Sequence, residues 1–538
     1  MKTYFIKHKK LTAVYILSAI FAAFMTVCVA FIYQMLSNAA VSGDIAEFSK
    51  VAVFAALYFI FEVLSDYFPR ITMTKLIQSI MNSIRVDIVD HYIDNNISDN
   101  LNEESSNRIS YITNDLQIVE VNYLKQLVFS VQVISVFVIA IISSLIVNGR
   151  LAIVILVFAF IPIFSPMISK KVLSGKRSKW QSKRNEFLKL FEEFSINLPF
   201  IQLRSLTNIF EQRLLESSKQ SRDSGIDFEG NQGKTFTIIY GLGNIVYSGA
   251  WIIGGIFILN GAATLPQLIA MTTLMGTISG PIQAFSTCYS EVTSSSPIVE
   301  KVMTLINSKN REQSNGVTKI SKIEKIELEK VGFGYKSLLL SNLSYSFRQG
   351  TTYAVKGKSG SGKTTLLQII LGITQPINGC VKINEILLSD LDKNNYYSKI
   401  AYIPQKTSIF EGSILENLVL FKEVNEKKAI DALISVGLQK FVSNNKIDNY
   451  KLSSKVSLSG GEERRLDIAR GLYSEAEVFV FDEPTSGVDN ENENVVSSII
   501  QGINDKIVIV VTHSENEKFL NSFDKVLSLE NGQLIEIK

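Results

Sequence analysis

Long apolar runs dominate the chain up to about residue 300, and mixed apolar and charged positions fill the rest. A helix needs roughly 20 apolar residues to cross the hydrocarbon core of a bilayer. Six runs reach about this length: 11–36, 51–68, 127–147, 151–169, 236–259 and 265–285. The polar triplet 148–150 divides the third run from the fourth, which predicts a tight turn between two helices. The first run is too long for a signal-peptide core and lacks a small-residue cleavage pattern, so we expect it to be retained.

The charge of the connecting segments predicts the orientation. The joins after the first, third and fifth runs are short and carry little positive charge, whereas the start of the chain and the join after the fourth run are rich in lysine. Cytoplasmic segments carry the excess of Lys and Arg, so both termini and the long joins 69–125 and 171–234 are expected in the cytoplasm. These joins place apolar residues at helical spacing, as at Ile80, Ile84 and Ile88, which predicts that they continue the membrane helices.

Glu62 and Asp66 are the two carboxylates within the six apolar runs. They are four positions apart, so a helix presents them on one face. Acidic residues inside a membrane are costly and usually face a bundle interior or a water-filled cavity. Two interpretations remain open: a contact for a cationic substrate, or a polar helix end near the membrane interface.

The length of the chain indicates more than one domain, and its composition does not indicate a particular ligand. A chain of 538 residues exceeds the usual size of one hydrophobic core. The polar segment 308–318 is expected to link a membrane domain, 1–307, to a second domain, 319–538. A formal charge of +3 does not indicate nucleic acid as a partner. The three cysteines lie far apart without a CxxC pattern, so neither a disulfide framework nor a zinc site is indicated.

A phosphate-binding motif stands in the second domain. Residues 357–365 read GKSGSGKTT, which matches GxxxxGK[ST], between an apolar strand at 352–355 and an apolar helix at 366–371. The glycines let backbone N–H groups approach phosphates, and the helix N-terminus attracts anions. Lys363 is expected to reach the β- and γ-phosphates, and Thr364 to bind Mg²⁺. The residues assigned to the nucleotide in this loop are Gly357, Ser359, Gly360, Ser361, Gly362, Lys363, Thr364 and Thr365.

Two later strands bring the groups that hydrolysis requires. The apolar strand 478–481 ends in Asp482 and Glu483. Asp482 is expected to hold Mg²⁺, and Glu483 is the natural general base for the attacking water. The apolar strand 507–511 leads to His513, which is one of only three histidines in the chain. Its place at a strand end beside the phosphate loop predicts a catalytic role.

The segment 458–462, LSGGE, resembles the signature motif of the ATP-binding cassette (ABC) ATPases. P-loop proteins of other kinds lack this motif. The resemblance implies that Ser459, Gly460 and Gly461 contact the nucleotide that a second ATPase domain holds.

The other motifs of the same family follow in order across residues 323–538. VGFGY resembles the aromatic A-loop, with Tyr335 expected to stack on adenine. AYIPQ resembles the Q-loop, with Gln405 expected near Mg²⁺ and near the contact with the membrane domain. SGVD resembles the D-loop and contains Asp489, and His513 takes the place of the family's H-loop histidine.

The first half is similar to the exporter form of the family. The resemblance rests on the six runs, the two long cytoplasmic joins and short segments such as 113–115 and 410–414. Two features depart from the family pattern. Glu462 stands where Gln is commoner, and 448–457 lacks the acidic-Gly-Glu-Arg-Gly stretch that often touches the membrane loops.

The resemblance implies an all-α six-helix transmembrane domain with cytoplasmic helical extensions, followed by an α/β P-loop ATPase domain. One P-loop and one signature per chain imply a homodimer with two composite sites for ATP and Mg²⁺. Coupling helices are expected near 102–106 and 197–203. The expected location is the cytoplasmic membrane of a bacterium, so the partners are the lipid bilayer, a second copy of the chain and a transported substrate.

Export driven by ATP hydrolysis is the function that the resemblance implies. No peptidase segment precedes the first run, which disfavours an exporter that also cleaves leaders. The acidic pair and the compact external loops favour a mature peptide as substrate, such as a bacteriocin, a modified peptide or a pheromone. A lipid or an amphiphilic drug is the alternative. An alternative of another class is a regulatory or channel-like ABC protein gated by ATP, against which the intact Glu483 and His513 argue.

Overall fold

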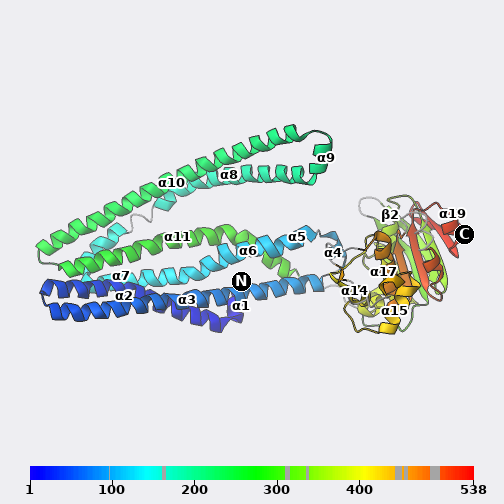
Figure 1. Cartoon of the computed structure of the whole chain (residues 1–538), viewed down its shortest axis with the longest axis horizontal. Helices are drawn as coiled ribbons and strands as arrows, with labels where there is room; N and C mark the ends of the chain where they lie inside the picture. The colour runs from blue at the N-terminus through cyan, green and yellow to red at the C-terminus, as the bar shows by residue number, and fades with distance from the viewer. Residues whose placement is uncertain are drawn as a thin grey trace. The chain divides into compact units, whose positions relative to one another are not determined.

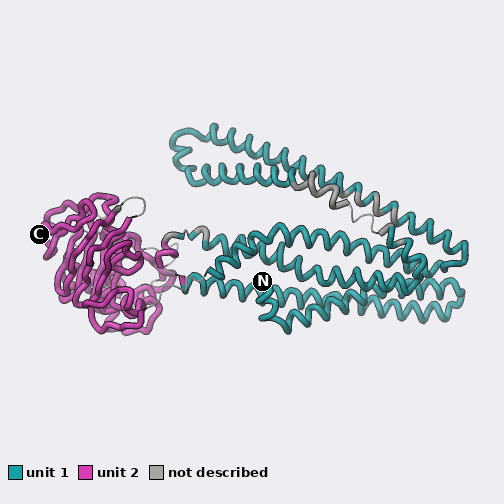
Figure 2. The backbone as a smooth tube through the Cα atoms, turned by 180° about the vertical axis from the view of Figure 1, so that it is seen from behind, with its two compact units in different colours: residues 1–94, 103–309 teal, residues 95–102, 310–538 magenta. Residues whose placement is uncertain are grey.

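The computed structural model describes residues 1–538 except 96, 104, 160–164, 309–315, 335–337, 443–450, 453–457 and 485–496. The chain forms two compact units, which Figure 2 distinguishes by colour. Unit 1 comprises Met1–Asp94 and Glu103–Lys309. Unit 2 comprises Asn95–Asn102 and Asn310–Lys538.

Unit 1 is helical throughout its described residues (Figure 1). Two short π-helical turns, η1 and η2, interrupt the region before the third long helix. The elements are α1 (Lys2–Lys7), α2 (Lys9–Ser42), α3 (Ile45–Asp94), α5 (Ser105–Ser110), η1 (Tyr111–Asp115), α6 (Leu116–Ile118), η2 (Val119–Leu124), α7 (Lys125–Ala159), α8 (Ser165–Ile196), α9 (Leu198–Leu203), α10 (Thr207–Leu259) and α11 (Leu265–Asn307).

Four stretches among the described residues are long and apolar enough to cross a membrane: Lys9–Ser42, Ile45–Asp94, Arg108–Val154 and Leu265–Asn307. They contain four of the expected runs. The expected run 151–169 includes residues outside the described set, and the described apolar part of the run 236–259 is the shorter Tyr247–Leu259. The count of six spans therefore stays a prediction.

The membrane helices continue well beyond bilayer thickness. Helix α3 is unbroken over 50 residues, which is about 75 Å at 1.5 Å per residue and more than twice the hydrocarbon core. Its distal part buries Ile80, Ile84 and Ile88 completely. Helices α8 and α10 also run far past the expected membrane segments and pair with each other, as Figure 1 shows. The expected helical extensions are therefore present.

Asn148 breaks the helix α7 at the expected turn. Its backbone leaves helical geometry, with φ −162° and ψ 100°. The side-chain oxygen accepts from Leu151 N at 3.1 Å, which caps the second helical segment. The side-chain nitrogen donates to Ala262 O at 3.0 Å, next to the start of α11. One asparagine thus closes one tight turn and ties it to another.

Unit 2 is an α/β domain built on two larger sheets. The six-stranded sheet has the order β12-β11-β3-β10-β9-β6, and β12 is its one antiparallel strand among those described. The four-stranded sheet has the order β2-β1-β4-β5, and β7 pairs with β8. The strands are β1 (Lys325–Gly334), β2 (Leu338–Arg348), β3 (Thr351–Lys356), β4 (Asn378–Ile383), β5 (Ile386–Leu387), β6 (Ile400–Ile403), β7 (Gly412–Ser413), β8 (Lys451–Leu452), β9 (Val478–Asp482), β10 (Ile507–Thr512), β11 (Lys525–Glu530) and β12 (Gln533–Glu536).

The position of the candidate site follows from the parallel strands. Strands β9 and β10 are buried at every residue, as expected for strands covered on both faces. Because β3, β10, β9 and β6 are parallel, their carboxyl ends meet at one edge.

The described helices of unit 2 are α4 (Ile97–Asn102), α12 (Lys363–Ile370), α13 (Lys393–Tyr397), α14 (Ile414–Val419), α15 (Glu426–Ser435), α17 (Gly460–Tyr473) and α19 (Glu517–Asn521), with 3₁₀ turns at η4 (Leu388–Asp390) and η5 (Gln439–Phe441).

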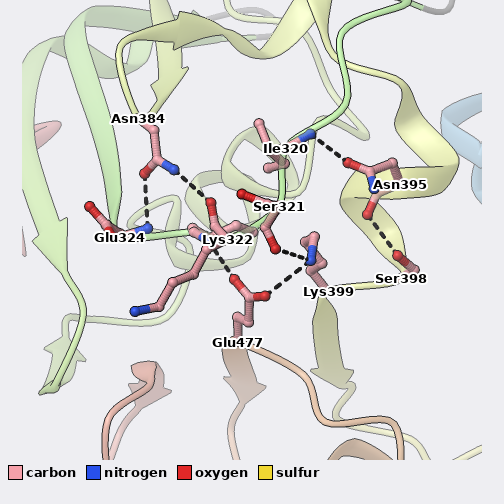
Figure 3. A network of polar contacts seen from close by, with 10 residues as sticks. Ile320, Ser321, Lys322, Glu324, Asn384, Asn395, Ser398, Lys399 and Glu477 are labelled. Carbon is pink, nitrogen blue, oxygen red and sulfur yellow. Dashed lines mark hydrogen bonds and ion pairs between the residues drawn. The ribbon is translucent and has the colours of Figure 1, made fainter.

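Polar contacts fasten residues 320–324, which follow the linker, to the rest of unit 2 (Figure 3). Lys399 Nζ donates to Ser321 O at 2.6 Å and to Glu477 Oε1 at 3.0 Å, and Glu477 also accepts from the backbone N–H of Ile323. Asn384 accepts from the N–H of Glu324 at 2.8 Å. The segment 320–324, which follows the undescribed residues 309–315, is therefore an integral part of unit 2.

Candidate functional site

The loop 357–362 joins β3 to α12 in a conformation that requires glycine. Gly360 and Gly362 have φ values of 77° and 98°, in the left-handed region that glycine adopts without steric cost. A Cβ on Gly357 would lie 2.7 Å from Ser361 Oγ and 3.1 Å from Leu529 O, so a side chain does not fit there. The loop therefore curls tightly around the N-terminus of α12, as the sequence predicts for a phosphate cradle.

Lys363 opens α12 and points back into this loop. Its ammonium nitrogen donates to Gly357 O at 2.9 Å and to Lys358 O at 3.0 Å. Lys363 as a whole is only 5% exposed. Burial lowers the pKa of Lys363, while the negative charges of Glu483 and Asp482 oppose that shift. A partly desolvated cation next to two acids is suited to binding an anion together with a metal ion.

Glu483 is held at both carboxylate oxygens. Oε1 lies 2.7 Å from His513 Nε2, and Oε2 accepts from Gln405 Nε2 at 3.0 Å. If Nε2 of His513 carries the proton shared with Glu483, Nδ1 is the nitrogen able to accept from Lys363, at 3.4 Å. The φ of Glu483 is 51°, and its N–H donates to Val511 O at 2.9 Å. A left-handed φ is uncommon for a non-glycine residue, and here it ends the regular strand geometry directly after Asp482.

Asp482 is the more buried of the two acids, at 6% exposure. Burial and the charge of Glu483 raise its pKa, against hydrogen bonds from the side chains of Thr364 and Tyr402 and the charge of Lys363. Thr364 thus lies beside Asp482, and these are two of the three residues, with Gln405, that the sequence places at Mg²⁺. Among the described residues no group of three or more His, Cys, Asp and Glu side chains could hold a metal ion. One carboxylate and one hydroxyl are instead typical of Mg²⁺ bound partly by substrate phosphates.

Tyr402 is a site residue that the sequence analysis did not assign. It lies on β6, three residues before Gln405, and is close enough to Asp482 for the two groups to interact electrostatically. Burial, together with the charge of Asp482, raises the pKa of Tyr402 to about 12, so it stays a hydrogen-bond donor at neutral pH. The sequence offered no signal for this role, because the role depends on the pairing of β6 with β9 in the sheet.

The signature segment forms the start of helix α17. Ser459 is the N-cap: its Oγ accepts from Glu462 N at 3.4 Å, and its own N–H donates to Glu462 Oε2 at 2.8 Å. Glu462, the residue that departs from the family pattern, thus completes a capping box, and it also pairs with Lys440. Within the part of the chain that is described, no hydrogen bond or ion pair joins Ser459, Gly460 or Gly461 to the loop 357–365.

Two predicted site residues lie outside the described residues. Tyr335 falls in 335–337 and Asp489 in 485–496, so their assignments stay predictions. The expected coupling segment 197–203 coincides with the short helix α9, and α4 ends where the expected segment 102–106 begins. Helix α4 is grouped with unit 2.

In the structure, Arg70 binds one member of the acidic pair Glu62 and Asp66 of α3. Asp66 Oδ2 forms an ion pair with Arg70 Nη2 at 2.7 Å and accepts from Arg70 Nε at 2.8 Å. Arg70 is four residues after Asp66, a spacing that already favours such a pair in a helix. The hypothesis of a cation contact therefore depends mainly on Glu62, which is half-buried.

Comparison with known proteins identifies the family. The model described as the ABC transporter transmembrane region matches residues 12–282, and the model described as ABC transporter matches 340–486. The chain belongs to the ABC transporter family, with the membrane region and the ATPase fused in one polypeptide. It is therefore an ATP-binding, ATP-hydrolysing membrane transporter.

Relatives and a solved structure agree with this assignment. The chain is 26% identical over 447 residues to a probable ABC transporter ATP-binding/permease protein of Haemophilus influenzae, covering 80% of this chain and 79% of the relative. It is 36% identical over 219 residues to the pediocin PA-1 transport/processing ATP-binding protein PedD of Pediococcus acidilactici, covering 39% of this chain but only 30% of PedD. The structure of a bacterial Atm1-family ABC exporter with ATP bound superposes with a TM-score of 0.79 at 18% identity, over 98% of this chain and 94% of that one. The fold is thus that of an ABC exporter.

Proposed function

We propose that the protein exports a peptide across the cytoplasmic membrane as a homodimer with two composite ATP sites. The observation that carries the hydrolytic part is the convergence of His513 and Gln405 on the two carboxylate oxygens of Glu483. The peptide part is supported by PedD, a relative named for pediocin transport, and by Glu62 on α3.

The ATP chemistry follows from the side chains around the loop. Lys363 exchanges the carbonyls of Gly357 and Lys358 for the β- and γ-phosphates of ATP. Glu483 accepts the proton of the attacking water, because each of its oxygens keeps a lone pair beyond the bonds it makes. His513 and Gln405 hold that carboxylate in orientation, since each fixes one of the two oxygens.

Thr364 and Asp482 are the residues that hold Mg²⁺ in this proposal. Burial and the charge of Glu483 raise the pKa of Asp482, which means that its ionised form is electrostatically disfavoured. A divalent cation beside it would relieve that penalty, and carboxylate and hydroxyl oxygens are ligands that Mg²⁺ prefers. When bound, Mg²⁺ neutralises charge on the phosphate oxygens.

The homodimer is supported by the single signature of the chain. Helix α17 is 14 residues long and begins at Gly460 with Ser459 as its N-cap, so its first N–H groups form an anion-binding end. In the family that the chain belongs to, the signature faces the nucleotide held by a second ATPase domain. A second copy of the chain supplies that nucleotide, so each site takes the loop 357–365 from one copy and Ser459 from the other. Both termini lie in the cytoplasm, in keeping with the lysines at the start of the chain.

The test uses the purified full-length protein in inside-out vesicles. ATPase rate and substrate uptake into the vesicles are measured with three probes: a cationic mature bacteriocin without its leader, a fluorescent phospholipid and an amphiphilic dye. The Glu483→Gln protein provides the background for uptake that does not depend on hydrolysis. We expect the peptide both to stimulate ATPase and to accumulate.

Each other outcome selects a different function. Stimulation and uptake with the lipid or the dye alone would replace the peptide by that substrate and leave the ATPase assignment intact. ATP hydrolysis without uptake of any probe, together with an ATP-dependent ion conductance, would favour the regulatory or channel-like alternative.

A further inference from the structure

Arg464 is a buried cation that none of the sequence motifs explains. It lies in the second turn of α17 and is only 9% exposed. Its guanidinium donates from Nη1 to Pro404 O and from Nη2 to Gln405 O, the latter at 2.8 Å. Two parallel N–H groups on a planar fork match two successive carbonyls, a geometry that the single ammonium of lysine cannot reproduce. The bonds therefore hold the path of the backbone at Gln405.

Gln405 continues this chain of contacts to the candidate base. Its backbone carbonyl is bound to Arg464, and its side-chain nitrogen lies 3.0 Å from Glu483 Oε2. A shift of the backbone at 405 would change the position of the Gln405 amide relative to Glu483. One residue thus connects α17, the helix that begins at the signature, with the carboxylate at the end of β9.

The rest of the α17 face secures the same segment. Asp467 and Arg470 follow Arg464 at helical spacing. Arg470 Nη1 donates to Asp467 Oδ1 at 2.5 Å and to Ser408 O at 2.8 Å. Asp467 is 8% exposed; burial raises its pKa, and Arg470 and the Thr407 side chain oppose that shift. The segment from 404 to 408 is therefore bound to α17 at several points, and Arg464 makes the contact nearest the ATP site.

Charge reinforces the geometry. Burial lowers the pKa of Arg464, and the carboxylates of Asp467 and Asp482 and the hydroxyl of Tyr402 oppose that shift. Asp482 and Tyr402 also interact with each other in the candidate ATP site. The guanidinium therefore acts on the candidate Mg²⁺ ligand through its charge as well as on Gln405 through hydrogen bonds.

We propose that Arg464 is a positioning residue for ATP hydrolysis, which couples the signature helix to Gln405 and through it to Glu483. The inference rests on the proposed roles of Gln405 and Glu483. Because α17 is one rigid helix from Ser459 onward, a displacement of the signature moves Arg464 and with it the backbone that carries Gln405. The state of the neighbouring nucleotide is thereby transmitted to the carboxylate of this chain's own site.

The test is a double-mutant cycle in the full-length protein with MgATP as the probe. Arg464→Gln removes the fork and the charge, and Arg464→Lys keeps the charge alone. We expect Arg464→Gln to lower kcat about 10- to 100-fold, the range for a misplacement of about 1 Å, with KM for ATP changed less than about threefold. Arg464→Lys should be nearly as slow. In a Gln405→Ala background, Arg464→Gln should cause less than about a threefold further loss, because both changes act on one contact.

The controls separate this role from simple loss of structure. Arg348→Gln makes the same change at an exposed arginine of β2. The melting temperature of each Arg464 variant is measured beside kcat, so that a loss of rate at an unchanged melting temperature reports positioning and not loss of structure. A normal kcat in Arg464→Gln, or losses that multiply fully in the double mutant, would overturn the proposal. A normal kcat in Gln405→Ala would refute the role of Gln405, and Glu483→Gln tests the base independently.

Discussion

His513 Nε2 lies 2.7 Å from Glu483 Oε1, although the two residues follow different strands of the sheet. Strands β10 and β9 pair in parallel with Val511 opposite Asp482, so the residues just beyond these strands emerge together at one edge. Glu483 has a left-handed φ directly after β9, where the regular strand geometry ends. The pairing of the two strands therefore brings the two residues of the proposed catalytic pair together.

Replacement of Glu483 by Gln should abolish turnover and keep nucleotide binding. Glutamine preserves the size of the side chain but cannot accept the proton of the attacking water, so kcat should fall by about 10²- to 10⁴-fold. ATP affinity should stay within a few fold, and an ATP-trapped dimer should appear in size-exclusion chromatography. Near-normal hydrolysis by this variant would remove Glu483 from the role of base.

The protein without nucleotide should tolerate the loss of the Asp482 charge. The folded-state pKa of Asp482 is raised, chiefly by burial, so its ionised form costs stability above that pKa, and the cost disappears as pH falls through it. Asp482→Asn should therefore melt at the same or a higher temperature than wild type at pH 7.5, and the difference should shrink toward pH 4. Mg²⁺ with ATP should stabilise only the wild type. A variant that is markedly less stable at pH 7.5 without Mg²⁺ would contradict this electrostatic account.

Composite sites should be recoverable by mixing two inactive chains. Lys363→Ala damages the phosphate loop, and Ser459→Arg blocks the signature. A heterodimer of the two has one doubly damaged site and one intact site, so co-expression should recover part of the ATPase activity that each variant lacks alone. Tandem affinity tags isolate the heterodimer for measurement. Full activity in a proven monomer would exclude the dimer.

The two acids of α3 should respond differently to neutralisation. Asp66 is already paired with Arg70, and an exposed pair of this spacing contributes only about 0.3–0.5 kcal/mol, so Asp66→Asn should change little. Glu62→Gln should reduce peptide-stimulated ATPase while basal ATPase stays intact. Basal rate, stimulated rate and melting temperature are measured on both variants. Equal effects of the two changes on stimulation would argue against Glu62 as the contact for a cation.

The segment that follows the linker should stabilise unit 2 through Glu477. Lys399 and Glu477 are each 18% exposed at their side chains, and Glu477 also accepts from Ile323 N. Glu477→Ala leaves a partly buried ammonium and an N–H without this acceptor, which costs about 1.5–3 kcal/mol. Hydrogen exchange of the unit 2 amides in the full chain measures the change. Glu475→Ala is the matched control, since the Glu475 side chain is 74% exposed, and an equal loss there would contradict the role of Glu477.

Several features were predictable because their signals are local. The glycines of the loop 357–362 are required by backbone conformations that a short motif encodes, and Asp482, Glu483 and His513 directly follow apolar strands. Tyr402 and Arg464 carry no such signal. Arg464 binds a carbonyl 59 residues earlier in the chain, and its partner is backbone, which has no residue type to recognise. The pairing of Asp66 with Arg70 is the opposite case, because their i,i+4 spacing is visible in the sequence and already favours an ion pair.

The sequence by itself determined the class of this protein: apolar runs longer than a soluble core needs, a phosphate loop, two acids after a buried strand and a signature motif. These are properties of adjacent residues, and adjacent residues dictate local backbone and hydrophobic pattern. Only the tertiary structure decided which side chains meet around Glu483 and that a buried arginine on α17 holds the backbone of Gln405. Such contacts depend on how parallel strands and helices pack, and packing joins residues whose distance along the chain carries no information about their distance in space.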